Sequence, residues 1–198
     1  MKILIIGAHG TIGTKVTAHF KQNHEVVTAA RTNCDFQVDI SSSKSIQDLM
    51  EKVGKIDAII NCAGAVKWND LYDLNEEDFY LGIKSKMMGQ VNLVRIGKNY
   101  LNDNGSITLI TGILADDPVY KTTSAALVNG GINSFVKAVA RELRNGIRIN
   151  AVSPGLVEDS ADMLHLFPGH ELVSMERVVN GFVKSVEGNI TGEVIRIY

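Results

Sequence analysis

Short apolar runs alternate with longer amphipathic stretches along the whole chain. The runs are rich in β-branched residues and predict strands at 3–6, 25–30, 36–38, 56–61, 106–111, 147–152 and 193–197. Between them, the spacing of apolar positions predicts helices at 11–22, 43–53, 76–82, 84–101, 122–144 and 174–186. Strands therefore alternate with helices from one end of the chain to the other.

Strands that are apolar on both faces and separated by helices are typical of parallel sheets covered on both sides. Right-handed crossovers then give a doubly wound sheet with its ligand at the carboxyl ends of the strands. Pro118, Pro154 and Pro168 fall in predicted loops, so no proline interrupts an element. We expect an α/β protein, a doubly wound parallel sheet (Rossmann fold) of about seven strands with helices on both faces. It should form a single domain over residues 1–198.

Composition and charge narrow the class of protein. A net charge of −2 offers no basic surface for nucleic acid or an anionic membrane. No apolar run approaches the ~20 residues that cross a bilayer, and the first residues do not form a signal peptide. Cys34 and Cys62 lack metal-ligand spacing, and the five histidines are scattered. We expect a cytoplasmic protein with no metal site and no nucleic-acid or membrane partner.

A glycine-rich turn follows directly on the first apolar run, and it reads Gly7-Ala8-His9-Gly10-Thr11-Ile12-Gly13. Residues without Cβ atoms let the chain turn sharply and bring its N–H groups close to a pyrophosphate. The helix that begins near Thr11 adds the partial positive charge of its N-terminus. This strand, turn and helix, closed by a second strand, predict a dinucleotide site.

Five segments, in their order and spacing, resemble the short-chain dehydrogenase/reductase family over nearly the whole chain. They are the glycine turn, Val38-Asp39-Ile40, Asn61-Cys62-Ala63-Gly64, residues 146–155 with Pro154-Gly155 at their end, and Ile190-Thr191-Gly192-Glu193. The resemblance implies a Rossmann domain that transfers hydride between a nicotinamide dinucleotide and a carbonyl or alcohol. The glycine spacing is looser than the usual one in that family, which does not harm phosphate binding.

The resemblance also assigns cofactor contacts. Asp39 matches the residue that hydrogen-bonds the adenine amino group. Asn61, Ala63 and Gly64 match the motif beside the adenine ribose, although the same residues also suit a plain strand end with a turn glycine. The remaining positions that the resemblance places at the cofactor are His9, Ile12, Ile40, Pro154 and Gly155.

Arg31 indicates which cofactor binds. A carboxylate at the end of the second strand would accept hydrogen bonds from the 2′-hydroxyl of NAD and repel a 2′-phosphate. The chain has Arg31 there and no acid. A guanidinium suits a phosphate, so we expect NADP(H) in preference to NAD(H). The alternative is a solvated surface arginine.

The family's catalytic positions have changed in this chain. Its tyrosine position is matched by Tyr120, but the lysine position four residues on is Ser124. The serine position falls on Gly112, with Thr111 one residue earlier, and the asparagine position is Lys86. In the family, the lysine ammonium lowers the pKa of the phenol and the serine donates to the substrate oxygen.

Two functions remain open from the sequence. In the first, Lys86 supplies the missing ammonium beside Tyr120, Thr111 replaces the serine hydroxyl, and the protein reduces a small carbonyl substrate with NADPH. A phenol of pKa ~10 is protonated at neutral pH and donates a proton, so reduction is favoured over alcohol oxidation. In the second, the protein binds NADP(H) as a sensor or scaffold with little or no turnover. Tyr120 would then be a turn tyrosine and Lys86 a solvated helix lysine.

The rest of the chain indicates the substrate side and the assembly. Only residues 156–173 remain to cover the substrate, and Met163, Leu164, Leu166 and Phe167 make that cover apolar or else pack on the sheet edge. The helices at 84–101 and 122–144 resemble those with which family members form dimers. We expect a homodimer or homotetramer that acts on a small carbonyl or alcohol.

Overall fold

The computed structural model describes residues 1–198 and contains a seven-stranded sheet in the order β3-β2-β1-β4-β5-β6-β7. All neighbouring strands run parallel. The strands are β1 (Lys2–Ile6), β2 (Glu25–Ala30), β3 (Phe36–Gln37), β4 (Ile56–Asn61), β5 (Leu101–Ile110), β6 (Arg148–Pro154) and β7 (Val194–Ile197). The strand order reverses between β1 and β4, which confirms the doubly wound sheet and puts the ligand crevice at their carboxyl ends.

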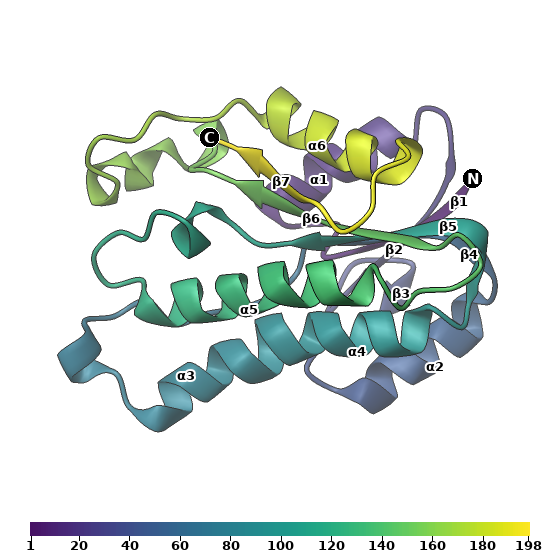
Figure 1. Ribbon diagram of the computed structural model, residues 1–198, viewed down its shortest axis with the longest axis horizontal. Helices are drawn as coiled ribbons and strands as arrows, with labels where there is room; N and C mark the ends of the chain where they lie inside the picture. Colours follow the sequence, from purple (N-terminus) through teal and green to yellow (C-terminus); the bar gives the residue numbers. More distant parts are fainter.

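Helices cover both faces of this sheet (Figure 1). The upper face in that view carries α1 (Thr11–Phe20) and α6 (Met175–Glu187), and the lower face carries α2 (Ser43–Val53), α4 (Met88–Gly97) and α5 (Thr123–Val139). A π-helical turn, η2 (Ile83–Met87), joins α3 (Glu76–Gly82) to α4. Three 3₁₀ segments follow the carboxyl ends of strands: η1 (Leu71–Asp73), η3 (Ile113–Ala115) and η4 (Glu158–Leu166). None of the helices is long and apolar enough to cross a bilayer.

The alternation of side chains along β1 explains why this strand is apolar throughout. Ile3 and Ile5 belong to the core beneath α1 and α6, while Leu4 and Ile6 belong to the core beneath α2, α4 and α5. All four side chains are fully buried. Successive residues of a strand point to opposite faces, so a strand covered on both sides needs apolar residues at every position.

The structure corrects the bounds of several predicted elements. β5 begins at Leu101 instead of 106, because Leu101 fills the core and the amide of Asn102 bonds Asp57 (2.7 Å). The helix predicted to run to 144 ends at Val139. In the next turn, amides bond the carbonyl three residues earlier, as Glu142 does with Val139, which gives tighter 3₁₀-type geometry. Gly146 then takes a left-handed φ of 69°. Both boundaries fall among polar and glycine residues, so the pattern of apolar positions did not predict them.

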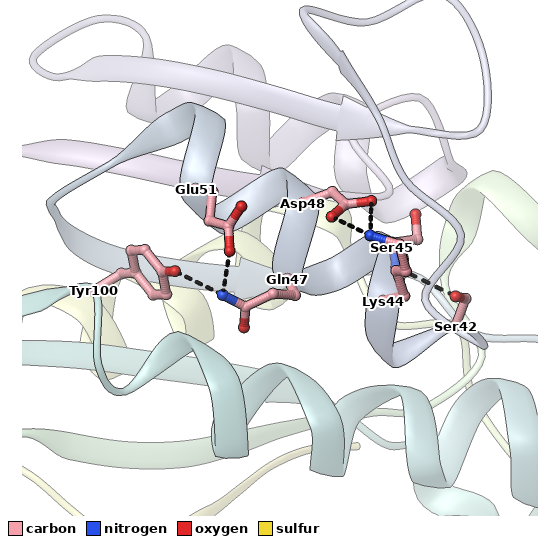
Figure 2. A network of polar contacts seen from close by, with 7 residues as sticks. All are labelled: Ser42, Lys44, Ser45, Gln47, Asp48, Glu51 and Tyr100. Atoms are coloured by element: carbon pink, nitrogen blue, oxygen red, sulfur yellow. Dashed lines mark hydrogen bonds and ion pairs between the residues drawn. The ribbon is translucent and has the colours of Figure 1, made fainter.

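A network of polar contacts joins the residues of α2 to one another and to Tyr100 (Figure 2). The Ser42 hydroxyl caps the N-terminus of α2 by accepting from the Ser45 amide (3.2 Å). Further along the helix, the Gln47 amide donates to Glu51 (2.7 Å) and to the hydroxyl of Tyr100 (2.9 Å), which lies just before β5. These bonds fix α2, and with it the loop that leads from β3 into α2.

Candidate active site

The predicted glycine turn is built so tightly that two of its glycines have no room for a side chain. Gly7 has a φ of 78°, and a Cβ there would lie 2.8 Å from the amide nitrogen of Ala63. A Cβ on Gly13 would overlap the carbonyl oxygen of Gly7. Gly10 is different, since the nearest atom to a Cβ on it is 3.5 Å away. Gly7 and Gly13 therefore allow the end of β1, the start of α1 and the end of β4 to meet.

The N-terminus of α1 opens from this turn with free donors. Gly10 is the N-cap residue and no side chain caps the helix. The first N–H groups of an uncapped helix have no partner within it, and they carry partial positive charge. Residues 11–13 thus present unpaired amides at the carboxyl end of β1, as a pyrophosphate requires.

A first cleft of ≈ 350 Å³ lies beside the glycine turn. It is lined by Ile6, Gly7, His9, Ala30, Arg31, Thr32, Val38, Ile40, Ala63, Gly64, Ala65 and Ser85. Seven positions that the sequence predicts to bind a cofactor follow the ends of four different strands. Six of them line this cleft, namely Gly7, His9, Arg31, Ile40, Ala63 and Gly64. The seventh, Asp39, lies next to it. The lining combines a glycine turn, apolar side chains and one guanidinium, which suits an adenosine with a phosphate chain.

Arg31 lies on the wall of the first cleft with its charge unpaired. It lines both this cleft and a polar groove of ≈ 400 Å³ that continues along β3 and α2. None of the ion pairs of the protein includes it. No acidic side chain lines the first cleft. An unpaired guanidinium at this place is available to a ligand phosphate.

Asp39 lies on the groove and not on the first cleft. Its carboxylate accepts hydrogen bonds from the amide (3.0 Å) and the hydroxyl (2.7 Å) of Ser41. These bonds, and to a smaller extent the charge of Arg31, hold the pKa of the carboxyl below its ordinary value. Asp39 is thus an ionised acceptor at the edge of the predicted adenine site.

The turn after β4 is shaped by Asn61 from within the protein. The side chain of Asn61 is fully buried, and its amide donates to the carbonyl of Ala63 (2.8 Å). Ala63 and Gly64 then line the first cleft. Asn61 itself does not line the cleft, so its contribution is to hold the turn.

A second cleft, of ≈ 220 Å³, lies at the carboxyl ends of β5 and β6. Ten of its seventeen lining residues are hydrophobic, and Lys86 is the one ionisable residue among them. The lining residues are Ile12, Val66, Trp68, Lys86, Thr111, Gly112, Ile113, Leu114, Ala125, Asn129, Pro154, Gly155, Leu156, Val157, Ser160, Met163 and Phe167. Pro154 and Gly155 are here, and of the four apolar cover residues, Met163 and Phe167 line the cleft while Leu164 and Leu166 do not.

Lys86 connects the two clefts. Its side chain crosses Gly64 of the first cleft, where a Cβ would lie 2.7 Å from Lys86 Cγ, and its Nζ donates to the carbonyl of Thr111 (3.4 Å) in the second. The π-helical turn η2 carries it. Burial lowers the pKa of the ammonium from 10.5 to about 8.

Tyr120 lies apart from both clefts. It precedes α5, its side chain is 73% exposed, and its hydroxyl donates to the carboxylate of Asp70. The next residue, Lys121, has a left-handed φ of 68°, which turns the chain before the helix begins. Tyr120 and Lys86 therefore bond different partners, and the structure does not bring their polar groups together at the second cleft.

The other two catalytic candidates are buried. Thr111 lines the second cleft, but its hydroxyl points to the carbonyl of Val152 (3.5 Å). Ser124 is fully buried and has no hydrogen-bond partner, and its hydroxyl oxygen lies 3.3 Å from where a Cβ on Gly82 would be. Ser124 thus packs α5 against α3.

Several residues that line the second cleft were not predicted from the sequence, among them Asn129 and Trp68. Asn129 on α5 is 2% exposed and its Oδ1 has no partner, although the residue lines the cleft. The available signal was a polar residue on the apolar face of a helix, in register with Ala125 one turn earlier. Trp68, in the segment between β4 and η1, packs against Phe167 with ring centroids 6.0 Å apart. No local pattern marks Trp68.

The chain is similar to several known proteins. A family model described as enoyl-(acyl carrier protein) reductase matches residues 7–177. The 3-oxoacyl-[acyl-carrier-protein] reductase FabG of Thermotoga maritima is 28% identical over 78% of this chain and 73% of its own length. The oxidoreductase UcpA of Escherichia coli is 30% identical over 62% of this chain, and the match spans 48% of UcpA.

Solved structures match the entire chain. The protein lin1944 of Listeria innocua is 44% identical with a TM-score of 0.98, and the match covers 100% of both chains. A small-chain dehydrogenase solved in complex with NADPH is 26% identical with a TM-score of 0.88, over 100% of this chain and 96% of that one.

Proposed function

Because this chain belongs to the short-chain dehydrogenase/reductase family, we propose that it reduces the carbonyl group of a small apolar molecule with NADPH. The observation that carries the proposal is the junction of two clefts at the carboxyl ends of the strands. One cleft has a glycine turn and an unpaired arginine, and the other is mostly apolar with a single half-buried lysine. A dinucleotide and a carbonyl compound need this pair of environments side by side.

The residues of the first cleft fit the cofactor. The unpaired amides at the start of α1 would hold the pyrophosphate, and Gly7 and Gly13 let the chain close into the turn that presents these amides. Asp39 and Ile40 would bound the adenine, and Ala63 and Gly64 the ribose. When bound, reduced nicotinamide supplies the hydride that adds to the carbonyl carbon.

Arg31 supports NADPH over NADH. It forms no ion pair in the protein, and the first cleft that it lines contains no carboxylate. A 2′-phosphate would be bound by a charge-assisted hydrogen bond there, whereas a 2′-hydroxyl would gain much less. The small-chain dehydrogenase solved with NADPH, at 26% identity, supports the same choice.

The catalytic candidates differ in what their positions allow. Lys86 and Thr111 line the second cleft, and of these Lys86 has the polar group with freedom to serve a substrate. Ser124 has a packing position on α5. Tyr120 competes as proton donor only if its side chain leaves Asp70 and turns inward.

A binding assay followed by a turnover screen tests the proposal. NADPH and NADH are titrated by fluorescence, and NADPH consumption is then followed with a panel of aliphatic and aromatic aldehydes, ketones and quinones. We expect tighter binding of NADPH and turnover of at least one apolar carbonyl compound. Binding of NADPH with no consumption across the panel would instead identify a cofactor-binding sensor or scaffold.

We also propose a homodimer or homotetramer formed through α4 and α5. Met88 on α4 is 39% exposed and Leu127 on α5 is 51% exposed, so each helix presents a large apolar side chain on the outside of the sheet layer. Burying such side chains against a second copy is favourable. Light scattering of the purified protein gives the assembly directly, and a monomer at high concentration contradicts it.

A further inference from the structure

The second cleft contains two polar side chains whose hydrogen-bonding groups are only partly paired within the protein. They are Lys86 on η2 and Asn129 on α5, which approach the same backbone unit from different helices. Lys86 Nζ reaches the carbonyl of Thr111 at 3.4 Å. Asn129 Nδ2 lies 3.4 Å from where a Cβ on Gly112 would be. The peptide between Thr111 and Gly112 is thus flanked by both side chains.

Asn129 makes no side-chain hydrogen bond within the protein, so its Nδ2 is an unused donor at the second cleft. It is 2% exposed, and its Oδ1 has no hydrogen-bond partner. A buried unsatisfied polar atom typically destabilises a protein, so such atoms call for an explanation. The amide borders a cleft that is otherwise mostly apolar. The Nδ2 of this carboxamide can donate to a ligand oxygen, whereas its Oδ1 can only accept from a ligand donor such as a hydroxyl.

The absence of a side chain at Gly112 lets the amide of Asn129 approach the end of β5. Gly112 lies directly after the last residue that continues the β5 pairing, and a larger residue there would separate the amide from the end of the strand. The position that the family resemblance assigns to a hydroxyl donor is therefore open, and the amide of Asn129 lies beside it.

We propose that Lys86 is the proton donor of the second cleft and that Asn129 binds the substrate carbonyl oxygen beside it, without the hydroxyl of Tyr120. This inference rests on the proposed carbonyl reduction. As hydride adds to the carbonyl carbon, the oxygen takes a proton from Lys86 Nζ and becomes the hydroxyl of the product alcohol. Lys86 is left neutral and recovers a proton from solvent. Asn129 donates to the oxygen while its negative charge develops.

The charges around Lys86 suit this role. No other ionisable residue lines the second cleft, and α5, which packs on η2, has none before Lys137. In the segment after β4, burial raises the pKa of the Cys62 thiol to about 12, and Asp70 is engaged by Tyr120. Lys67 of the same segment is exposed and does not line the cleft. With a pKa of about 8, Lys86 is mostly protonated at neutral pH and gives up its proton readily.

Trp68 provides a test that needs no turnover. It is the only tryptophan of the chain and lines the second cleft, so its fluorescence reports on a molecule bound there. Hexanoate is the probe, because its carboxylate can accept from both donors and its tail suits the apolar walls. We expect Lys86→Met to weaken hexanoate binding about 10- to 100-fold, and Asn129→Leu about 3- to 10-fold.

Binding of hexanoate should also depend on pH. The ammonium of Lys86 attracts the carboxylate, so affinity should fall as the pH rises through about 8. This dependence should disappear in Lys86→Met. Lys84→Met is the matched control, because Lys84 is exposed on the same turn and lies over the ring of Tyr80. It should bind hexanoate like the unaltered protein.

Turnover separates Lys86 from Tyr120. With a carbonyl compound that the unaltered protein reduces, we expect Lys86→Met to lower kcat about 10²- to 10⁴-fold and Tyr120→Phe to change it little. Asn129→Leu should lower kcat about 10²-fold. Thermal unfolding of Asn129→Leu should show no loss of stability, since the change removes a buried unsatisfied oxygen.

The outcomes are distinct. If Lys86→Met and Asn129→Leu both bind hexanoate like the unaltered protein, this proposal is overturned whether or not the protein consumes NADPH. It is also overturned if Tyr120→Phe loses turnover while Lys86→Met retains it. Hexanoate binding through both residues, without reduction of any carbonyl compound, overturns the proton-donor role and the proposed function together, and leaves a carboxylate-binding cleft.

Discussion

The side chain of Lys86 passes over the bare Cα of Gly64, where a Cβ would lie 2.7 Å from Lys86 Cγ and 2.9 Å from Lys86 Cβ. Gly64 also has a φ of 144°, which side chains rarely allow. A motif that belongs to the first cleft by sequence thus creates the passage by which a lysine reaches the second cleft. The two clefts depend on each other through this one contact.

Replacing Gly64 should disturb Lys86 specifically. Gly64→Ala forces the lysine out of its passage and also strains the backbone, so we expect the free energy of unfolding to fall by about 2–6 kcal/mol. The reference is Gly54→Ala, where φ is 71° and no atom lies within 4 Å of the new Cβ. The ψ of −150° at Gly54 lies in a region that is essentially confined to glycine, so the variant should lose about 1–3 kcal/mol of stability from backbone strain alone and should keep the function of the second cleft. Urea unfolding measures both, and equal losses in the two variants would refute the contact.

The glycine turn should tolerate a methyl group at one position and not at another. A Cβ on Gly13 overlaps a backbone oxygen, whereas a Cβ on Gly10 meets nothing closer than 3.5 Å. Gly13→Ala should therefore lose several kcal/mol of stability and measurable NADPH binding, while Gly10→Ala should keep its stability. Thermal unfolding and NADPH fluorescence provide the two readouts. Equal behaviour of the two variants would mean that the turn is not closed as described.

Arg31 should discriminate between cofactors. Arg31→Ala removes the unpaired charge from the first cleft, so the affinity for NADPH should fall about 10- to 100-fold while the affinity for NADH changes little. Titration of both reduced cofactors against both proteins measures the ratio. Lys52→Ala, which removes a positive charge from the far end of the adjoining groove, is the matched control. A parallel loss for NADH in Arg31→Ala would assign the residue a general role in binding and not one in selectivity.

Asp116 should make the end of the sheet sensitive to acid. Hydrogen bonds from Arg196 (3.0 Å from both Nε and Nη2) and from Tyr198 hold the pKa of its carboxyl below the ordinary 3.8. A depressed pKa contributes stability that is present above the unfolded pKa and lost as the pH falls through the folded one. The groups are partly exposed, so the contribution should be at most about 1 kcal/mol.

The variant Arg196→Met isolates this contribution. At pH 7 it should unfold at a slightly lower urea concentration than the unaltered protein, and the difference should shrink as the pH is lowered below 3.8. The ion pair of Arg196 with Asp116 joins β7 to the end of η3 beside the second cleft. Because the variant lacks this link, limited proteolysis of residues 113–117 should also become faster. A difference that persists unchanged in acid would show that lost packing, and not charge, destabilises the variant.

The parts of this protein that the sequence alone determined are those that depend on neighbours along the chain. Apolar runs such as Ile3–Ile6 predicted the strands because each residue of a two-sided parallel strand must be buried. The glycine turn was predictable for the same reason, since Gly7 and Gly13 meet a constraint within one strand–helix unit. Arg31 followed from its place directly after a strand.

The tertiary structure decided the second cleft, because its donors come from elements far apart in the chain. Lys86 reaches it only through the space that Gly64 leaves on another segment, and a π-helical turn, which no apolar pattern marks, sets its direction. Tyr120 matches a motif, yet the left-handed backbone at Lys121 and the carboxylate of Asp70 hold it outside. In the sequence, Asn129 is one polar residue on the apolar face of a helix, and only the packing of that helix brings it beside Gly112. Side-chain direction at such points depends on long-range packing and electrostatics, and spacing along the chain carries no information about either.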